Sequence, residues 1–173
     1  MNLDNLELSG LSGEQFVRLK DGQSITGVFR GEAVTVRKHF FKDKNPINCT
    51  GRECPECLRG GEKPRPRHRL NFVTKDETGH YVAKVFEQGP RVFSSLKDLN
   101  TEYDLEHTVV KIKRTGSTKD DTVYTIVPVK DYMLTKIQEN ELSKVQLIDL
   151  TNVEPPAKKE PGKGELPEED IPF

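Results

Sequence analysis

The chain has 173 residues, of which 33% are hydrophobic and 32% charged, with no Trp and a net charge of -1. This length suits a single domain, and the low apolar fraction indicates that part of the chain stays outside its core. No apolar run reaches the ~20 residues of a membrane-spanning helix. The start of the chain carries Asp4 and Glu7 where a signal peptide would be basic. These features argue against a membrane protein and predict a cytoplasmic one.

Charge is distributed unevenly along the chain. Residues 30–69 hold eleven basic and five acidic residues, a local net charge of +6. The flanking segments 1–29, 70–150 and 151–173 carry -2, -2 and -3. A local concentration of cations is typical of a surface that binds a polyanion, with an ordinary solvated face as the alternative.

Short β-like runs dominate residues 15–129. Two runs rich in β-branched and aromatic residues, 24–30 and 33–41, flank Gly31-Glu32 and predict a hairpin with a tight turn. Residues 42–68 have no hydrophobic period and contain all three cysteines, which predicts a long inserted loop. Further strands are expected at 69–73, 80–86, 107–114 and 122–129, and helices at 91–99 and 131–145.

This pattern predicts a mainly β fold. Five or so short strands with one late helix fit a small Greek-key barrel of the oligonucleotide-binding (OB) type, and an SH3-like barrel is the nearest alternative. The domain is expected to span residues 1–150. Residues 151–173 are rich in Pro, Lys, Glu and Gly and predict a disordered acidic tail.

The three cysteines lie within nine residues of one another. Cys54 and Cys57 form a CxxC pair, Cys49 adds a third sulfur, and structural zinc is almost always tetrahedral, so a fourth ligand is needed. His39, at the end of an expected strand, is the preferred fourth ligand, and His68 is the alternative. The sequence therefore predicts one structural zinc in a loop spanning about residues 39–68.

The zinc ligands do not form an enzyme motif. Zinc nucleobase deaminases need His-x-Glu and a Pro before the first Cys, whereas Phe40-Phe41 follow His39 and Glu53 precedes Cys54. Phosphate-binding loops, GxSxG and HExxH are also missing from the sequence. We therefore expect no catalytic residues.

Cations and aromatic rings alternate in residues 37–44 and 65–72. Such interleaving suits single-stranded nucleic acid, because phosphates attract the cations and unpaired bases stack on the rings. An exposed Tyr81 and one of Phe40 or Phe41 are the expected stacking rings, although for any one of Phe40, Phe72 and Phe86 a place in the core is the preferred interpretation. The expected contact residues are Arg37, Lys38, Phe41, Lys42, Lys44, Arg65, Arg67, Arg69, Tyr81, Lys84, Lys111 and Lys113.

The order His39, Cys49, Cys54, Cys57, with a Cys-Pro-x-Cys pair set between strands, resembles the zinc subdomain of T-even phage single-stranded DNA-binding proteins. The runs that follow look like the rest of that family's OB barrel, so the resemblance covers roughly residues 24–130. It implies a protein that coats single-stranded DNA without sequence preference during phage replication, recombination or repair, in the cytoplasm of a bacterial host.

The end of the chain carries a second resemblance, to the acidic tip of bacterial single-stranded DNA-binding proteins. In that family the tip recruits replication and repair enzymes, which implies the same partners here. The residues concerned are Glu168, Glu169, Asp170, Ile171, Pro172 and Phe173. Two other functions remain open: a zinc-stabilised OB-type protein-interaction adaptor and, less favoured, a zinc-dependent nucleic-acid enzyme.

Overall fold

The computed structural model describes residues 15–118 and 120–153. The expected tail beyond residue 153, with its acidic tip Glu168–Phe173, lies outside the described residues. The elements are β1 (Ser24–His39), β2 (Ile47–Asn48), α2 (Pro55–Leu58), β3 (Arg65–Lys75), β4 (Tyr81–Gln88), α3 (Pro90–Glu102), β5 (Thr108–Thr115), β6 (Val123–Met133) and α4 (Lys136–Ser143).

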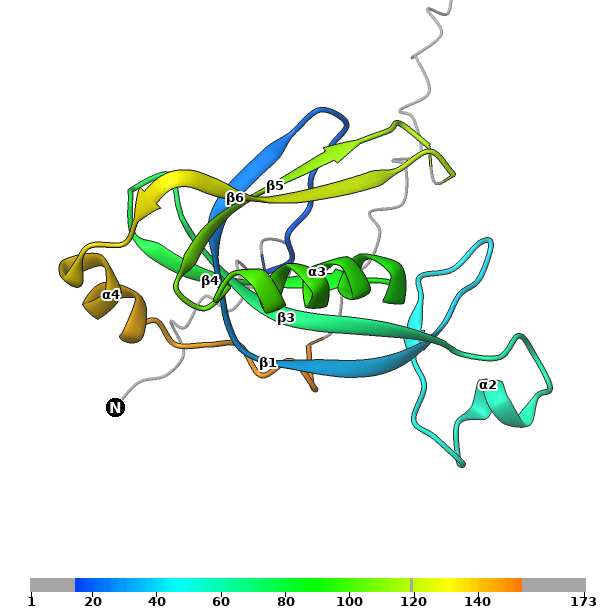
Figure 1. Cartoon of the computed structure of the whole chain (residues 1–173). Coiled ribbons are helices and arrows are strands. Elements are labelled where there is room, and N and C mark those ends of the chain that lie inside the picture. The colour runs from blue at the N-terminus through cyan, green and yellow to red at the C-terminus, as the bar shows by residue number, and fades with distance from the viewer. Residues whose placement is uncertain (1–14, 119, 154–173) are drawn as a thin grey trace, which may run out of the picture.

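The strands form one antiparallel sheet in the order β4-β3-β1-β5-β6, with β2 paired to β1 (Figure 1). The mainly β prediction is therefore confirmed. Within the described part of the chain no ladder joins β4 to β6, so the sheet does not close into the expected barrel. Residues 15–17 cover the β4 edge instead: the Val17 amide donates to the Val85 carbonyl (2.9 Å) and the Val85 amide to the Gln15 carbonyl (2.6 Å).

The expected hairpin at Gly31-Glu32 is wrong, because β1 is one continuous strand. Both of its halves pair with β3: residues 27–30 lie opposite 71–74, and residues 34–38 lie opposite 65–69. Between them three β1 residues face Leu70 alone, and Gly31 has a φ of 73°. The glycine therefore serves a β-bulge, which bends a strand without reversing it.

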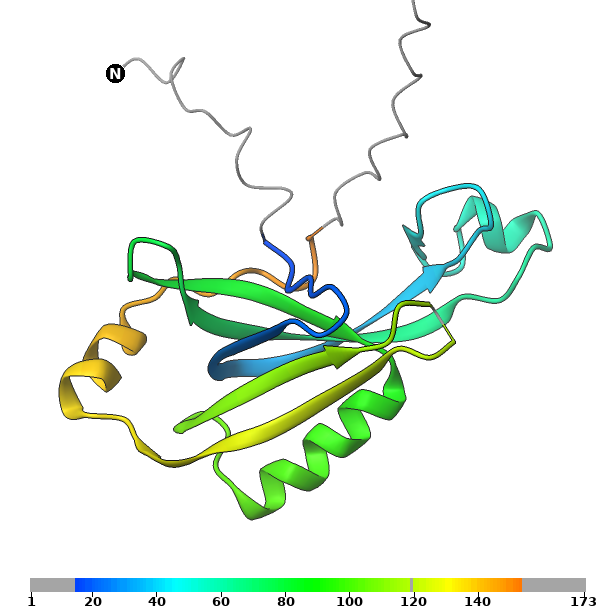
Figure 2. The same ribbon diagram turned by 90° about the horizontal axis from the view of Figure 1, so that it is seen from above.

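The bent strand β1 takes part in two parts of the sheet. Its first half pairs with a strand on each side, since Gly27 lies opposite Thr74 of β3 and opposite Val110 of β5. A Cβ at Gly27 would collide with the backbone of Val73, which explains why this position is a glycine. Its second half runs with β3 away from the rest of the sheet (Figure 2). We call this extension, residues 34–69, the arm.

The main core lies on the inner face of the curved sheet. Phe29, Phe72 and Phe86 are buried there. The ring centroid of Phe29 lies 5.1 Å from that of Phe72 and 5.6 Å from that of Phe86. Helix α3 covers this core with Leu96 and with the partly buried Val92. The helix predicted at residues 91–99 is therefore confirmed, and its apolar face packs as its spacing indicates.

The outer face of β1, β3 and β4 is covered by the segment after α4. We call residues 144–153 the strap. Asn71 donates to the Ile148 carbonyl (3.1 Å) and accepts from the Ile148 amide (3.0 Å), while Leu150 and Val153 are buried. The helix expected at residues 131–145 is shorter in the structure, because β6 continues to Met133 and Thr135 caps α4 in a capping box.

Candidate metal centre and basic arm

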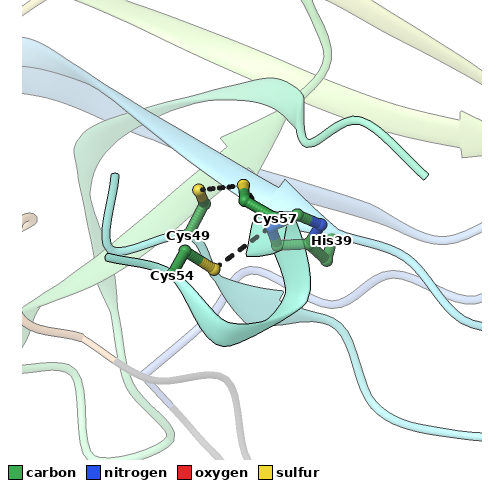
Figure 3. Close-up of side chains that lie close together, drawn as sticks. All are labelled: His39, Cys49, Cys54 and Cys57. Carbon is green, nitrogen blue, oxygen red and sulfur yellow. Dashed lines mark hydrogen bonds between the residues drawn. The ribbon is translucent and has the colours of Figure 1, made fainter. Parts of the chain in front are cut away.

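The four predicted metal ligands meet at the end of the arm (Figure 3). His39 is the last residue of β1, and Cys49 follows β2, where its amide donates to the Arg37 carbonyl (2.7 Å). Cys54 caps the short helix α2, and Cys57 lies inside that helix. Strand pairing therefore positions His39 and Cys49, and the single turn of α2 positions Cys54 and Cys57.

The spacing of the ligand atoms fits a tetrahedral zinc ion. All four lie within 4.8 Å of one another. The sulfurs of Cys49 and Cys57 are 3.6 Å apart, and Nε2 of His39 lies 3.4 Å from the Cys54 sulfur and 3.5 Å from that of Cys57. Ideal zinc–ligand bonds at tetrahedral angles would place two sulfurs about 3.8 Å apart and a sulfur and a nitrogen about 3.6 Å apart.

The imidazole of His39 is oriented for metal binding. Its Nδ1 lies 3.1 Å from the Glu62 carbonyl oxygen, to which it can only donate, so the lone pair of Nε2 faces the sulfurs. His39 is buried and held rigidly by β1. The alternative ligand His68 lies elsewhere: its Nδ1 contacts Oγ1 of Thr35 (2.9 Å), and its ring packs against Phe93.

The surroundings of the thiols differ in their electrostatics. Backbone amides of Cys57 and Thr50 donate to the Cys54 sulfur and lower its pKa to about 6, which favours the thiolate form that binds metals. The hydrogen bond with Cys49, together with burial, raises the pKa of Cys57 to about 11. Burial lowers the pKa of His39, but hydrogen bonds to Cys49 and Glu62 outweigh it and raise the pKa overall.

Two expected DNA contacts, Lys38 and Arg69, are wrong. Both side chains are buried on one carboxylate, Glu87: Nζ of Lys38 lies 2.7 Å from each oxygen, and Nε of Arg69 lies 2.7 Å from Oε2. Nη1 of Arg69 also donates to the Leu150 carbonyl of the strap (2.8 Å). These cations therefore stabilise the sheet and the strap, and a phosphate cannot reach them.

The other expected arm contacts remain accessible. Arg37, Lys42, Lys44 and Arg65 are exposed, whereas Phe41 and Arg67 are half-buried. Two of these cations lie over rings of the same segments: the Arg67 guanidinium is 4.9 Å from the Phe40 centroid, and Nζ of Lys44 is 5.9 Å from that of Phe41.

The remaining expected contacts lie on other strands. Lys111 and Lys113 are exposed on β5 and alternate with the buried Val110 and Ile112, as their period of two predicted. Lys84 is half-buried. The predicted exposure of Tyr81 is wrong, because its ring packs against the outer-face cluster around Val28 and Val73.

A groove of about 700 Å³ separates β1 of the arm from the metal-binding loop. Val34 and Val36 line it, together with the guanidinium-bearing Arg37 and Arg52, and no carboxylate belongs to its lining. Among the described residues neither arginine forms an ion pair. Sequence reasoning missed Arg52, because its place opposite Arg37 depends on how the loop folds back onto β1.

Comparison with known proteins finds no matching family model, curated protein or solved structure. In the described ranges no helix combines the length and apolar character needed to cross a membrane.

Proposed function

We propose that this chain is a sequence-independent single-stranded DNA-binding protein whose binding surface is the arm and the groove beside the metal centre. The observation that carries the proposal is the groove lining, which brings Arg37 and Arg52 together without a carboxylate. Stacked guanidinium and phenyl groups, such as Arg67 on Phe40, continue the cationic and aromatic surface next to it.

The sheet topology supports an OB-type assignment, with the barrel partly open. The strand order β4-β3-β1-β5-β6 places a long bent first strand at the centre, and α3 joins β4 to β5. OB folds are partly open Greek-key barrels that bind oligonucleotides with the loop between their first two strands. In this chain residues 40–64 form the corresponding loop, and they contain Arg52 and three of the four metal ligands.

The metal centre has a structural role in this proposal. His39, Cys49, Cys54 and Cys57 would hold one zinc ion, and a closed set of one nitrogen and three sulfurs leaves no position for a substrate. The ion would supply the bonds that fix the loop against β1. Arg37 of β1 and Arg52 of the loop then line the groove in a fixed geometry, so they bind phosphates without first being ordered.

Lack of sequence preference follows from the groups present. Arginine and lysine bind phosphates, and a phenyl ring stacks on any base, so neither contact identifies a base. The acidic tip Glu168–Phe173 resembles a recruitment motif and supports a role in bringing replication or recombination enzymes to the bound strand.

Titration with labelled oligonucleotides tests the proposal. We expect single strands of different sequence to bind about equally and more tightly than duplex, with affinity falling as salt rises. Arg37→Ala combined with Arg52→Ala should reduce affinity and the salt slope. Arg59→Ala is the matched control, because Arg59 is the exposed residue directly after α2 and pairs with Glu56 outside the groove lining. Equal losses in both variants, or no binding by the native protein, would contradict it.

A protein-interaction adaptor is the second candidate, favoured by Met133 and Ile137, which are 88% and 73% exposed. Exposed apolar side chains that form a patch are typical of protein interfaces, and these two are four positions apart in the chain. Binding to such a partner would depend weakly on salt, whereas binding to DNA depends on it strongly.

A further inference from the structure

A second pocket, of about 330 Å³, lies at the other end of β1 from the arm. Its floor is the outer face of the sheet, where Val28, Val73 and Val109 come from three adjacent strands. Two tyrosines, Tyr81 and Tyr132, belong to its lining. Mostly apolar pockets with a few polar groups are typical of small-ligand sites, and this volume is at their lower end.

Tyr132 is placed at the pocket by an irregular stretch of β6. Between the pairs Thr108–Met133 and Val110–Pro128, four residues of β6 lie opposite Val109 alone. Within this bulge Asp131 has a φ of 59°, a left-handed conformation that is unfavourable for a residue with a side chain. Bulges redirect side chains, and retained backbone strain often accompanies a binding site.

The two rings are held in different ways. Tyr132 is 45% exposed, and its hydroxyl oxygen accepts a hydrogen bond from Nε2 of Gln138 (2.8 Å), which fixes it against α4. The Tyr81 ring is half-buried, and Nζ of Lys75 lies 5.0 Å from its centroid. Tyr132 thus offers an accessible ring, and Tyr81 brings a cation to the same pocket.

The charge of the pocket lining favours an anion. Lys75 is in the lining, no carboxylate is, and exposed Lys111 pairs with Thr26 on the same face of the sheet. The groove between α3 and β1 is the opposite case, since its lining includes Glu32, Asp104 and Glu106 against Lys97. A phosphate chain would be repelled from that groove and attracted to the Tyr132 pocket.

We propose that the Tyr132 pocket takes a base of a bound single strand, with the base stacked on Tyr132 and the flanking phosphates near Lys75 and Lys111. This inference rests on the proposed function and adds a second contact region, far from the arm along β1. The arm contributes mainly cations, whereas this pocket contributes a base-stacking ring.

Substitution of Tyr132 tests the pocket in the full chain, using anisotropy of a labelled oligonucleotide and of a matched abasic one. Tyr132→Ala should weaken binding of the normal oligonucleotide about fivefold or more, the usual effect of one lost stack, and leave the abasic one nearly unchanged. Tyr132→Phe loses the hydrogen bond with Gln138 but keeps the ring. Because the ring makes the stack, this variant should bind like the native protein. Tyr103→Ala is the matched control, because Tyr103 is 42% exposed but lies outside the pocket lining.

Tyrosine emission gives a direct second readout, because the chain has four Tyr and no Trp. The normal oligonucleotide should quench the tyrosine emission of the native protein more strongly than that of Tyr132→Ala. The abasic oligonucleotide should quench the emission of both proteins to the same extent. If the oligonucleotide binds but Tyr132→Ala has no effect, or weakens abasic binding equally, the pocket inference is wrong and the proposed function stands. If Tyr132→Ala instead changes only the sedimentation of the protein, the pocket is a protein interface and the inference is again wrong. If the native protein binds no single strand, the proposed function fails, and the pocket inference fails with it.

Discussion

The sheet and the metal-binding loop are stabilised in different ways. In the sheet, Phe29, Phe72 and Phe86 pack edge to face in a continuous apolar core. In residues 40–64, Cys54 is the one buried side chain, and α2 buries none of its residues. The loop therefore lacks the apolar burial that normally offsets the entropy of ordering a chain. Bonds to a metal ion held by His39 and the three cysteines would supply that order, together with the short pairing of β2 with β1.

The comparison shows how a binding loop can be ordered without hiding its cations. An apolar core at residues 40–64 would require side chains that cover one another, and few exposed arginines or lysines would remain. Metal coordination needs four ligand atoms, which leaves the side chains of Lys42, Lys44 and Arg52 free to face solvent. The loop lies within residues 30–69, the segment whose net charge is +6.

The largest expected effect follows from removing a metal ligand. Cys54→Ser should weaken zinc binding by more than about 100-fold, beyond the usual effect of losing a supporting residue around a metal site. Residues 40–64 should then exchange their amide hydrogens rapidly, while the sheet stays protected, because structural zinc contributes directly to the order of its site. Zinc analysis and residue-resolved hydrogen exchange measure the two effects.

Leu58→Ala is the control for this variant, because Leu58 lies in α2 and is 74% exposed. It should keep one zinc per chain and a protected loop. Less than one zinc in carefully prepared native protein, or a loop that stays protected after chelation, would show that the loop does not depend on the metal.

The reverse experiment targets the sheet. Phe72→Ala removes a fully buried ring that contacts Phe29, and it should lower the free energy of unfolding by about 3–5 kcal/mol. Phe41→Ala removes a half-buried ring of the loop and should lower the free energy of unfolding by less than about 1 kcal/mol. Denaturant unfolding followed by circular dichroism gives both values. Similar losses would mean that the loop has an apolar core after all.

The sequence predicted the metal ligands better than the cation contacts, and the reason is physical. Metal ligands are recognisable by chemistry and short spacing, and His39 was expected at the end of a strand. The fates of Lys38 and Arg69 depend on Glu87 and on the strap, which approach them from far along the chain. Alternation along a strand shows which residues share a face. It does not show that a later segment covers that face.

The error at Gly31 has a similar cause. A glycine between two β-like runs fits both a tight turn and a bulge. After a tight turn the second run pairs with the first run, whereas after a bulge both runs pair with the same neighbouring strand. Here β3 is long enough to pair with both runs, so β1 bends and continues. The pairing that decides the outcome joins residues 27 to 47 positions apart in the chain.

Two arginines of β3 allow the contrast between exposed and buried cations to be measured. Arg67→Ala should lower the slope of log affinity against log salt by about 0.7, the value for one lost phosphate contact on a single strand. Arg69→Ala should leave the slope unchanged and lower the free energy of unfolding by roughly 3 kcal/mol, because it breaks a buried ion pair. A reduced slope in Arg69→Ala would indicate that the strap opens when DNA binds.

The smallest expected effect concerns a carboxylate that anchors α4 to β1. Glu139 of α4 accepts hydrogen bonds from Nη2 of Arg30 (2.8 Å) and from Nδ1 of His107 (3.1 Å). Burial raises the pKa of Glu139, but these bonds outweigh it and hold the pKa below its usual value. Glu139→Gln should therefore loosen α4 by about 1 kcal/mol at neutral pH and leave the metal-binding loop unchanged.

The pH dependence of that loosening follows from the direction of the pKa shift. Because the pKa of Glu139 is lower in the folded protein than its unfolded value of about 4.3, its contribution is complete above that value and is lost as pH falls through the folded pKa. The difference in α4 amide protection between the variant and the native protein should thus be largest near pH 7 and vanish once the pH has fallen below the folded pKa of Glu139. Acid would also release a bound zinc ion, but equally in both proteins, so their difference reports on Glu139 alone. A difference that grows in acid would mean that the carboxylate is not the group that anchors α4.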